Sequence, residues 1–82
     1  MSKRRRLADL KKGEAGVIQS VRGTGSTPFA RRLLEMGFLE GSRVQVIHEA
    51  PFGGDPVAVR VRGALIALRR NEANEIEVEL SE

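Results

Sequence analysis

Valines recur at a spacing of two in two neighbouring segments of the chain, 43–48 and 57–62. In the first, Val44 and Val46 flank a glutamine, and in the second Val57, Val59 and Val61 alternate with an alanine and two arginines. A period of two is typical of a β-strand with one buried face, and it also fixes the register of the strand. The intervening segment, 51–56, is rich in glycine and proline. The pattern predicts two antiparallel strands joined by a loop.

Three further segments have strand character, and one has the spacing of a helical turn. Residues 15–22 read as a strand with apolar residues on both faces, and residues 76–80 alternate apolar residues with glutamates. The apolar run 64–68 is long enough for a buried strand and too short for a helix. Residues 69–74 read as a polar bend. Leu7 and Leu10 suit one helical turn on the core, closed near Gly13.

A short helix is predicted between the first and second strands. Thr27 can cap its free N–H groups, and Pro28 is well suited to the first helical position. Gly37 is the expected left-handed C-cap, after which Phe38 and Leu39 can fold back onto the last turn. The apolar stripe, at helical spacing, consists of Phe29, Leu33 and Met36, flanked by Ala30 and Leu34. Five strands and one inserted helix predict a mainly β, small, partly open barrel, with a short N-terminal helical turn.

The charge is unevenly distributed, with a formal net charge of +3. Residues 1–12 carry six basic residues against one aspartate, whereas residues 71–82 carry five glutamates and no basic residue. Residues 1–6 lack apolar anchors, so we expect a disordered basic tail there and a single domain over 7–82. The chain has no cysteine and no apolar run near the length that spans a bilayer. We therefore expect a soluble, cytoplasmic protein.

Candidate catalytic and metal-binding groups are few. His48 is the only histidine, and its neighbour Glu49 would point to the opposite face of a strand. An oxygen site for iron would need Glu40, Glu49 and Asp55 to converge, although isolated surface carboxylates are usually solvated. The segment 23–27 superficially resembles a phosphate-binding loop but lacks the P-loop lysine and spacing, so a connector is the better interpretation. We predict no enzyme activity, cofactor or metal site.

The order of glycine, apolar and loop positions from Leu7 to Leu80 resembles the FeoA family. The resemblance rests on an ordered set of motifs: Leu7-x-x-Leu10-x-x-Gly13-x-x-Gly16-x-Ile18, Arg32-Leu33-x-x-Met36-Gly37-Phe38-x-x-Gly41-x-x-Val44-x-Val46, Ala50-Pro51-x-Gly53-Gly54-Asp55-Pro56, Arg62-Gly63-x-x-Ile66-Ala67-Leu68-Arg69 and Glu72-Ala73-x-x-Ile76-x-Val78. It implies an SH3-like barrel and a role in bacterial ferrous iron uptake. Free-standing members of the family look like cytosolic accessories of the membrane transporter FeoB. Similar domains are also fused to iron-dependent repressors.

The hypothesis is a docking module that binds the cytosolic part of a FeoB-like transporter, and thus meets a membrane only through that transporter. The candidate partner-binding residues lie on the helix, on the turn after it and on the glycine-rich loop: Arg31, Arg32, Glu35, Phe38, Leu39 and Phe52. Arginine is favoured at interfaces, and a phenylalanine in a loop of small residues must pack or bind. The alternatives are a solvated helix face and a loop that plugs the barrel.

Two other functions are open at this point. One is an RNA- or ribosome-binding barrel that uses the basic segment Lys3–Arg6 together with Arg60 and Arg62, although the chain has three phenylalanines and no tyrosine or tryptophan for stacking on bases. The other is weak self-association through an unpaired strand edge.

Overall fold

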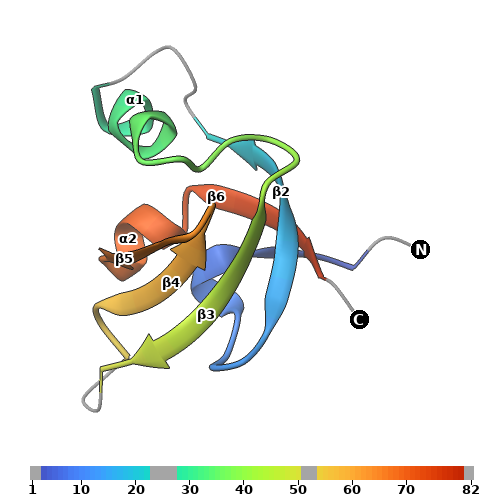
Figure 1. Cartoon of the computed structure of the whole chain (residues 1–82), viewed down its shortest axis with the longest axis vertical. Helices are drawn as coiled ribbons and strands as arrows, with labels where there is room; N and C mark the ends of the chain where they lie inside the picture. Colours follow the sequence, from blue (N-terminus) through green and yellow to red (C-terminus); the bar gives the residue numbers. More distant parts are fainter. Residues whose placement is uncertain (1–2, 23–27, 51–53, 81–82) are drawn as a thin grey trace.

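Six antiparallel strands form one curled sheet in the computed structural model, which describes residues 3–22, 28–50 and 54–80 (Figure 1). The order across the sheet is β1-β6-β2-β3-β4-β5, so β1 and β5 are the two edge strands. The strands are β1 (Arg4–Arg6), β2 (Ala15–Val21), β3 (Arg43–Glu49), β4 (Val57–Val61), β5 (Ala64–Leu68) and β6 (Ile76–Leu80).

Three short helices accompany the sheet in the part of the chain that the structure describes. A 3₁₀ turn, η1 (Leu7–Asp9), follows β1, and α2 (Arg70–Ala73) connects β5 to β6. The longest helix, α1 (Pro28–Glu35), is inserted between β2 and β3 and lies over one end of the curled sheet, whereas β3 and β4 are joined at the other end (Figure 1). Among the described residues, no helix has the length and apolar character needed to span a bilayer.

The valine pattern of β3 and β4 is confirmed. Val44 pairs with Val61 and Val46 with Val59, and all four side chains are buried. The register shifts by one residue between Val46 and His48, which is a β-bulge. The mainly β fold with an inserted helix and an N-terminal helical turn is therefore as predicted, with six strands instead of five.

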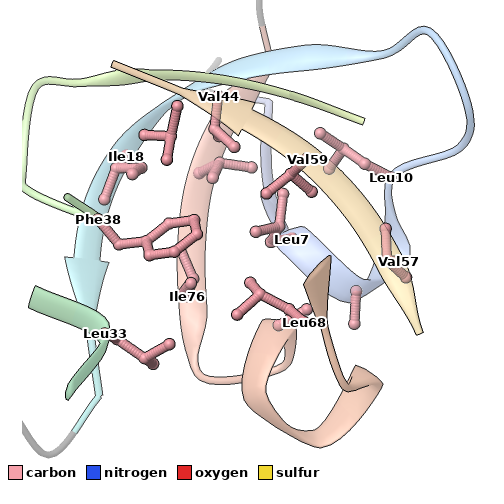
Figure 2. Packing of buried hydrophobic residues seen from close by; sticks show 14 of the residues in the cluster. Leu7, Leu10, Ile18, Leu33, Phe38, Val44, Val57, Val59, Leu68 and Ile76 are labelled. Atoms are coloured by element: carbon pink, nitrogen blue, oxygen red, sulfur yellow. The ribbon is translucent and has the colours of Figure 1, made fainter. Parts of the chain in front are cut away.

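The core lies inside the curl of the sheet, between the strands and the three helices. Leu7 and Leu10 are buried, as their spacing predicted. Figure 2 shows the Phe38 ring pointing into this cluster, with Ile18, Leu33 and Ile76 around it. The largest fully buried side chains are Phe38, Leu7, Ile18, Leu33, Leu68, Ile76, Val44, Val46, Val57, Val59, Val61 and Val78.

The end of α1 has the hydrogen bonds of a Schellman motif. Gly37 has a φ of +106°, and its N–H donates to the carbonyl of Leu34 over 3.0 Å. The N–H of Phe38 donates to the carbonyl of Leu33 over 3.1 Å. This pair of bonds reverses the chain and brings Phe38 back against Leu33, which is the hydrophobic contact that usually accompanies the motif. The predicted C-cap is confirmed.

A second glycine, Gly16, allows a close approach between strands. A Cβ atom at this position would lie 2.7 Å from the carbonyl oxygen of Glu79 and 3.2 Å from the Cβ of Val78. Gly16 pairs with both Val44 and Leu80, so β2 is enclosed on both sides at this point. Any side chain here would push β6 away from β2.

The prediction of a disordered segment over 1–6 is wrong for Arg4–Arg6, which form β1 against β6. In the register, Arg4 lies opposite Glu79 and Arg6 opposite Glu77, so two arginines and two glutamates share one face of the sheet. Arg4 Nη1 lies 3.3 Å from Glu77 Oε1. Opposite charges across an antiparallel pair stabilise it by about 0.2–1 kcal/mol each. The basic start of the chain and its acidic end are therefore neighbours.

Two predictions for residues 64–74 also need correction. β5 is not a buried strand, because Ala64, Leu65 and Ala67 are exposed and only Leu68 is fully enclosed. The reason is its position at the sheet edge, where no other strand covers it. Residues 69–74 contain the helix α2 instead of a simple polar bend, and Ala73 in this helix belongs to the core.

The burial of Leu33 generates the first prediction. Leu33→Ala should lower the free energy of unfolding by about 2–5 kcal/mol, because it leaves a cavity at the contact between α1 and the sheet. Chemical denaturation measures this loss. Leu39→Ala is the matched control, since Leu39 is 40% exposed and its truncation should have a much smaller effect. Equal losses for the two variants would contradict the packing of α1 described here.

Gly37 generates the second prediction. Gly37→Ala should destabilise the domain by about 1–2 kcal/mol, because a Cβ atom is unfavourable at positive φ. Space is not the obstacle, since the nearest atom to that Cβ would be Arg62 Cδ at 3.4 Å. Gly37→Asn should be less destabilising than Gly37→Ala, since asparagine tolerates the left-handed region better. Thermal unfolding of both variants tests the order, and a fully stable alanine variant would contradict it.

Candidate functional site

An open groove of about 520 Å³ lies where α1, β5 and α2 meet. Arg32 contributes from α1, Ala67 from β5, and Pro56 from the segment that leads into β4. The residues that line it are Arg32, Pro56, Ala67, Arg69, Asn71 and Glu72. We call this the α1–β5 groove. The helix and the end of the glycine-rich loop, which the sequence analysis proposed as parts of one surface, thus border a single groove.

Glu72 connects α1 to α2 at this groove. Its Oε1 accepts a hydrogen bond from the backbone N–H of Arg69 over 2.8 Å, which is the glutamate half of a capping box for the short helix α2. Its Oε2 lies 3.8 Å from Arg32 Nη1. The Glu72 side chain is 12% exposed, whereas that of Arg32 is 70% exposed. The carboxylate is therefore held by the helix start, while most of the arginine faces solvent.

Arg70 fixes the base of the β3–β4 loop next to the groove. Its Nε donates to the carbonyl of Gly54 over 3.1 Å, and its backbone N–H donates to Asp55 Oδ1 over 3.0 Å. Its Nη1 also donates to the carbonyl of Ala8, and its Nη2 lies 3.7 Å from Glu49 Oε1. One guanidinium thus ties α2 to η1 and to both sides of the β3–β4 loop. The loop base beside Pro56 has a fixed position relative to the groove.

The structure separates the predicted partner-binding residues into three groups. Arg31, Arg32 and Glu35 are exposed on α1, and Leu39 is 40% exposed just after it. Phe38 is completely buried, so its assignment as a partner contact is wrong: the left-handed turn at Gly37 directs its ring into the core. Phe52 lies outside the described residues. Of the exposed set, Arg32 is the residue that lines the groove.

Sequence reasoning missed the part of the groove formed by β5 and α2. Ala67 was assigned to a buried strand, and Glu72 to a bend. A signal for Glu72 was available, because an acidic residue three positions after a helix start is typical of a capping box. The exposure of β5 had no local signal, since it depends on which strands flank it in the sheet.

The described residues contain no group of three or more His, Asp or Glu side chains arranged to hold a metal ion. His48 is exposed on β3, and Glu40 is exposed in the turn before it. Glu49 lies next to Arg70, and Asp55 Oδ1 lies 3.9 Å from Arg69 Nη1. Two of the three carboxylates proposed for an iron site, Glu49 and Asp55, thus face arginines. The segment 23–27, weighed as a phosphate loop, and the Thr27 cap lie outside the described residues.

A curled sheet of short antiparallel strands with a capped helix at its end is the architecture of a small SH3-like barrel domain. The particular family follows from comparison with known proteins. The chain belongs to the FeoA domain family, whose model matches residues 5–80. The resemblance found in the sequence is confirmed.

Three relatives illustrate the family. The Fe(2+) transport protein A/Fe(2+) transporter FeoB fusion protein of Porphyromonas gingivalis is 44% identical over 75 residues, which are 92% of this chain and 8% of the fusion protein. The crystal structure of Stenotrophomonas maltophilia FeoA complexed with zinc, a prokaryotic SH3 domain protein, is 34% identical. It has a TM-score of 0.77 over 96% of this chain and 88% of that one. An FeoA-like protein from Clostridium acetobutylicum, solved by NMR, is 28% identical, with a TM-score of 0.87 over 100% and 92% of the two chains.

The hydrogen bond from the Arg69 N–H to Glu72 should stabilise α2 measurably. Glu72→Ala should destabilise the domain by about 0.5–2 kcal/mol, because the N–H of Arg69 loses its acceptor at the start of α2. Glu72→Gln keeps an acceptor oxygen at the same place and should be less destabilising. Urea denaturation of the two variants measures the difference. If the alanine variant were as stable as the original chain, Glu72 would not be what holds α2 beside the groove.

Proposed function

We propose that this chain is a cytosolic accessory domain of ferrous iron uptake, which docks on the cytosolic part of a FeoB-type transporter by protein–protein contact. The observation that carries the proposal is the P. gingivalis relative, in which a 44%-identical domain and the transporter are one polypeptide. Fusion raises the effective concentration of one domain beside another. The S. maltophilia relative, proposed as a ferrous iron transport activating factor, supports the same role.

The α1–β5 groove and the exposed face of α1 are the surface we propose for this contact. Arg31 and Arg32 are exposed, and an arginine fork can bind carboxylates in a bidentate manner. The contact between Arg32 and Glu72 is long at 3.8 Å and mostly exposed on the arginine side. Such pairs contribute about 0–1 kcal/mol, so a partner carboxylate can replace Glu72 at low cost. The proposed partner-binding residues with described side chains are Arg31, Arg32, Glu35 and Leu39.

The proposed role requires no reaction by the chain itself. The sequence has no cysteine, and its one histidine is exposed on β3 without an acidic or hydroxyl partner among the described residues. A nucleophile needs an adjacent base to be activated. The absence of enzyme activity stays a prediction, and turnover is not needed to explain any feature of the groove.

The placement of the basic N-terminal segment argues against RNA binding. Arg4 lies across from Glu79, with its Nη1 3.3 Å from Glu77 Oε1, and Arg6 lies across from Glu77 in the register, so β1 pairs with an acidic strand. A phosphate backbone would have to compete with these glutamates and would meet their negative charge. The docking proposal is therefore favoured over the nucleic-acid alternative.

Calorimetric titration of the purified cytosolic part of a FeoB-type transporter with this chain tests the proposal. Arg32→Glu should weaken binding by at least about 10-fold, which corresponds to about 1.4 kcal/mol and is typical of a charge reversal inside an interface. Arg5→Glu is the matched control, because it makes the same charge change on β1, the other edge strand.

The two variants also distinguish docking through the α1–β5 groove from docking through the β1 edge. Arg5→Glu should leave the affinity for the transporter unchanged. No binding by the original chain, or a larger loss with Arg5→Glu than with Arg32→Glu, would contradict docking through this surface.

A further inference from the structure

The free edge of β5 offers backbone hydrogen-bonding groups to a partner. β4 and β5 are joined by a two-residue turn in which Arg62 and Gly63 have φ values of +50° and +80°, as in a type I′ hairpin. In such a hairpin the flanking pair, Val61 and Ala64, is hydrogen-bonded, and hydrogen-bonded pairs then alternate along the ladder. The N–H and C=O groups of Leu65 and Ala67 therefore point away from β4. In the described part of the chain, β5 pairs with β4 alone.

The two edges of the sheet are protected very differently. β1 is three residues long and consists of arginines, and short charged edges discourage pairing with another chain. β5 has five residues, none of them charged, without proline and with a regular register to β4. Natural edge strands usually carry one of these protective features. β5 has none within its own residues, which indicates an edge that is kept available for pairing.

Side chains on the outer face of β5 are apolar and are bordered by arginines. Leu65 lies opposite Arg60 on β4. It is 61% exposed, compared with 40% for Leu39, the other exposed large apolar residue of the described part of the chain. Ala67 lines the α1–β5 groove together with Arg32 and Arg69. Two carboxylates lie beside these arginines: Glu72, which is largely buried and accepts the N–H of Arg69, and Asp55, whose Oδ1 lies 3.9 Å from Arg69 Nη1. The surface beside the free edge is therefore apolar in its centre and basic at its rim.

We propose that the free edge of β5 binds an extended acidic segment of a partner protein, which adds to the sheet as a seventh strand. The segment's backbone pairs with the outward groups of Leu65 and Ala67, and its carboxylates meet Arg32, Arg60 and Arg69. Strand addition of this kind takes its affinity from main-chain hydrogen bonds and its specificity from side chains at alternate positions. The inference rests on the proposed function, because it specifies the kind of contact by which docking would occur.

A second copy of this chain fits the same edge less well. Antiparallel pairing of two β5 strands would place Arg62, which precedes β5 in one copy, near Arg69, which follows β5 in the other. Like charges placed together across an interface cost several kcal/mol in unfavourable cases. An acidic segment removes this repulsion, and for this reason we assign the edge to a partner with carboxylates.

A blocked seven-residue peptide that alternates valine and glutamate is the probe for this proposal. Titrated into the full chain labelled with ¹⁵N, it should shift the amide signals of residues 64–68 and of Arg32 and Arg69, with slowed hydrogen exchange at Leu65 and Ala67. A peptide of the same length with lysine in place of glutamate should bind at least about 10-fold more weakly, because it opposes the arginines. Unchanged signals at β5 with the acidic peptide, or equal binding of both peptides, would overturn the proposal.

Two further probes isolate the backbone contribution. Ala67→Pro removes one outward N–H and no bond to β4, so it should weaken the acidic peptide at least about 10-fold. An acidic peptide N-methylated at alternate residues tests the same bonds in the original chain, in case the proline variant does not fold. Two such peptides, methylated at the odd or at the even positions, cover both possible registers. If both bound as tightly as the unmethylated peptide, strand addition would be contradicted.

The peptide experiments contain no transporter, so their failure differs from failure of the proposed function. Transporter binding without peptide binding would contradict strand addition and leave docking in place. Peptide binding at β5 without transporter binding would support the edge site and contradict the proposed partner. Slowed exchange at Leu65 and Ala67 that grows with protein concentration, in the absence of peptide, would assign the edge to self-association and overturn the proposal.

Discussion

The burial of Phe38 is the constraint on which the position of α1, and with it one wall of the groove, depends. Gly37 takes a conformation that other residues rarely adopt, and the two hydrogen bonds that close α1 turn the next residue inward. An eight-residue helix is too short to be stable alone, so packing must hold it. The Phe38 and Leu33 side chains provide that packing at the end of the curled sheet (Figure 2). Once α1 is fixed in this way, Arg32 comes within reach of Glu72, and the helix forms one wall of the groove.

Local patterns predicted the parts of the fold whose cause is local. The valines of β3 and β4, the leucines around η1 and the glycine after α1 each carry their own signal, and each was confirmed. β1 could not be predicted in this way, because three arginines become a strand only when the glutamates of β6, more than 70 residues later, lie beside them. The apolar run of β5 is equally compatible with a central strand and with an exposed edge. The candidate site was therefore predicted on its α1 side, at Arg31, Arg32, Glu35 and Leu39, and missed on its β5 and α2 side, where tertiary neighbours determine exposure.

The structure explains the uneven distribution of charge along the chain, which the composition alone does not. A basic N-terminal segment suggested a nucleic-acid partner, but β1 and β6 place those arginines against an acidic strand. The arginines that remain exposed beside an apolar edge are elsewhere, around β5 and the α1–β5 groove. One edge of the sheet is thus shielded by charge, and the other is open. The same physical rule, that unpaired strand edges attract other chains, explains both the arginines of β1 and the binding role that we propose for β5.

Hydrogen exchange of this chain, compared with and without the cytosolic part of a FeoB-type transporter, tests the central claim most directly. Exchange reports the backbone positions that a partner covers or hydrogen-bonds, without any substitution in the chain. The account predicts slower exchange in α1, β5 and α2, with β1 and β3 unchanged. Slowing confined to β1 and β3, or no change anywhere at saturating transporter, would contradict it.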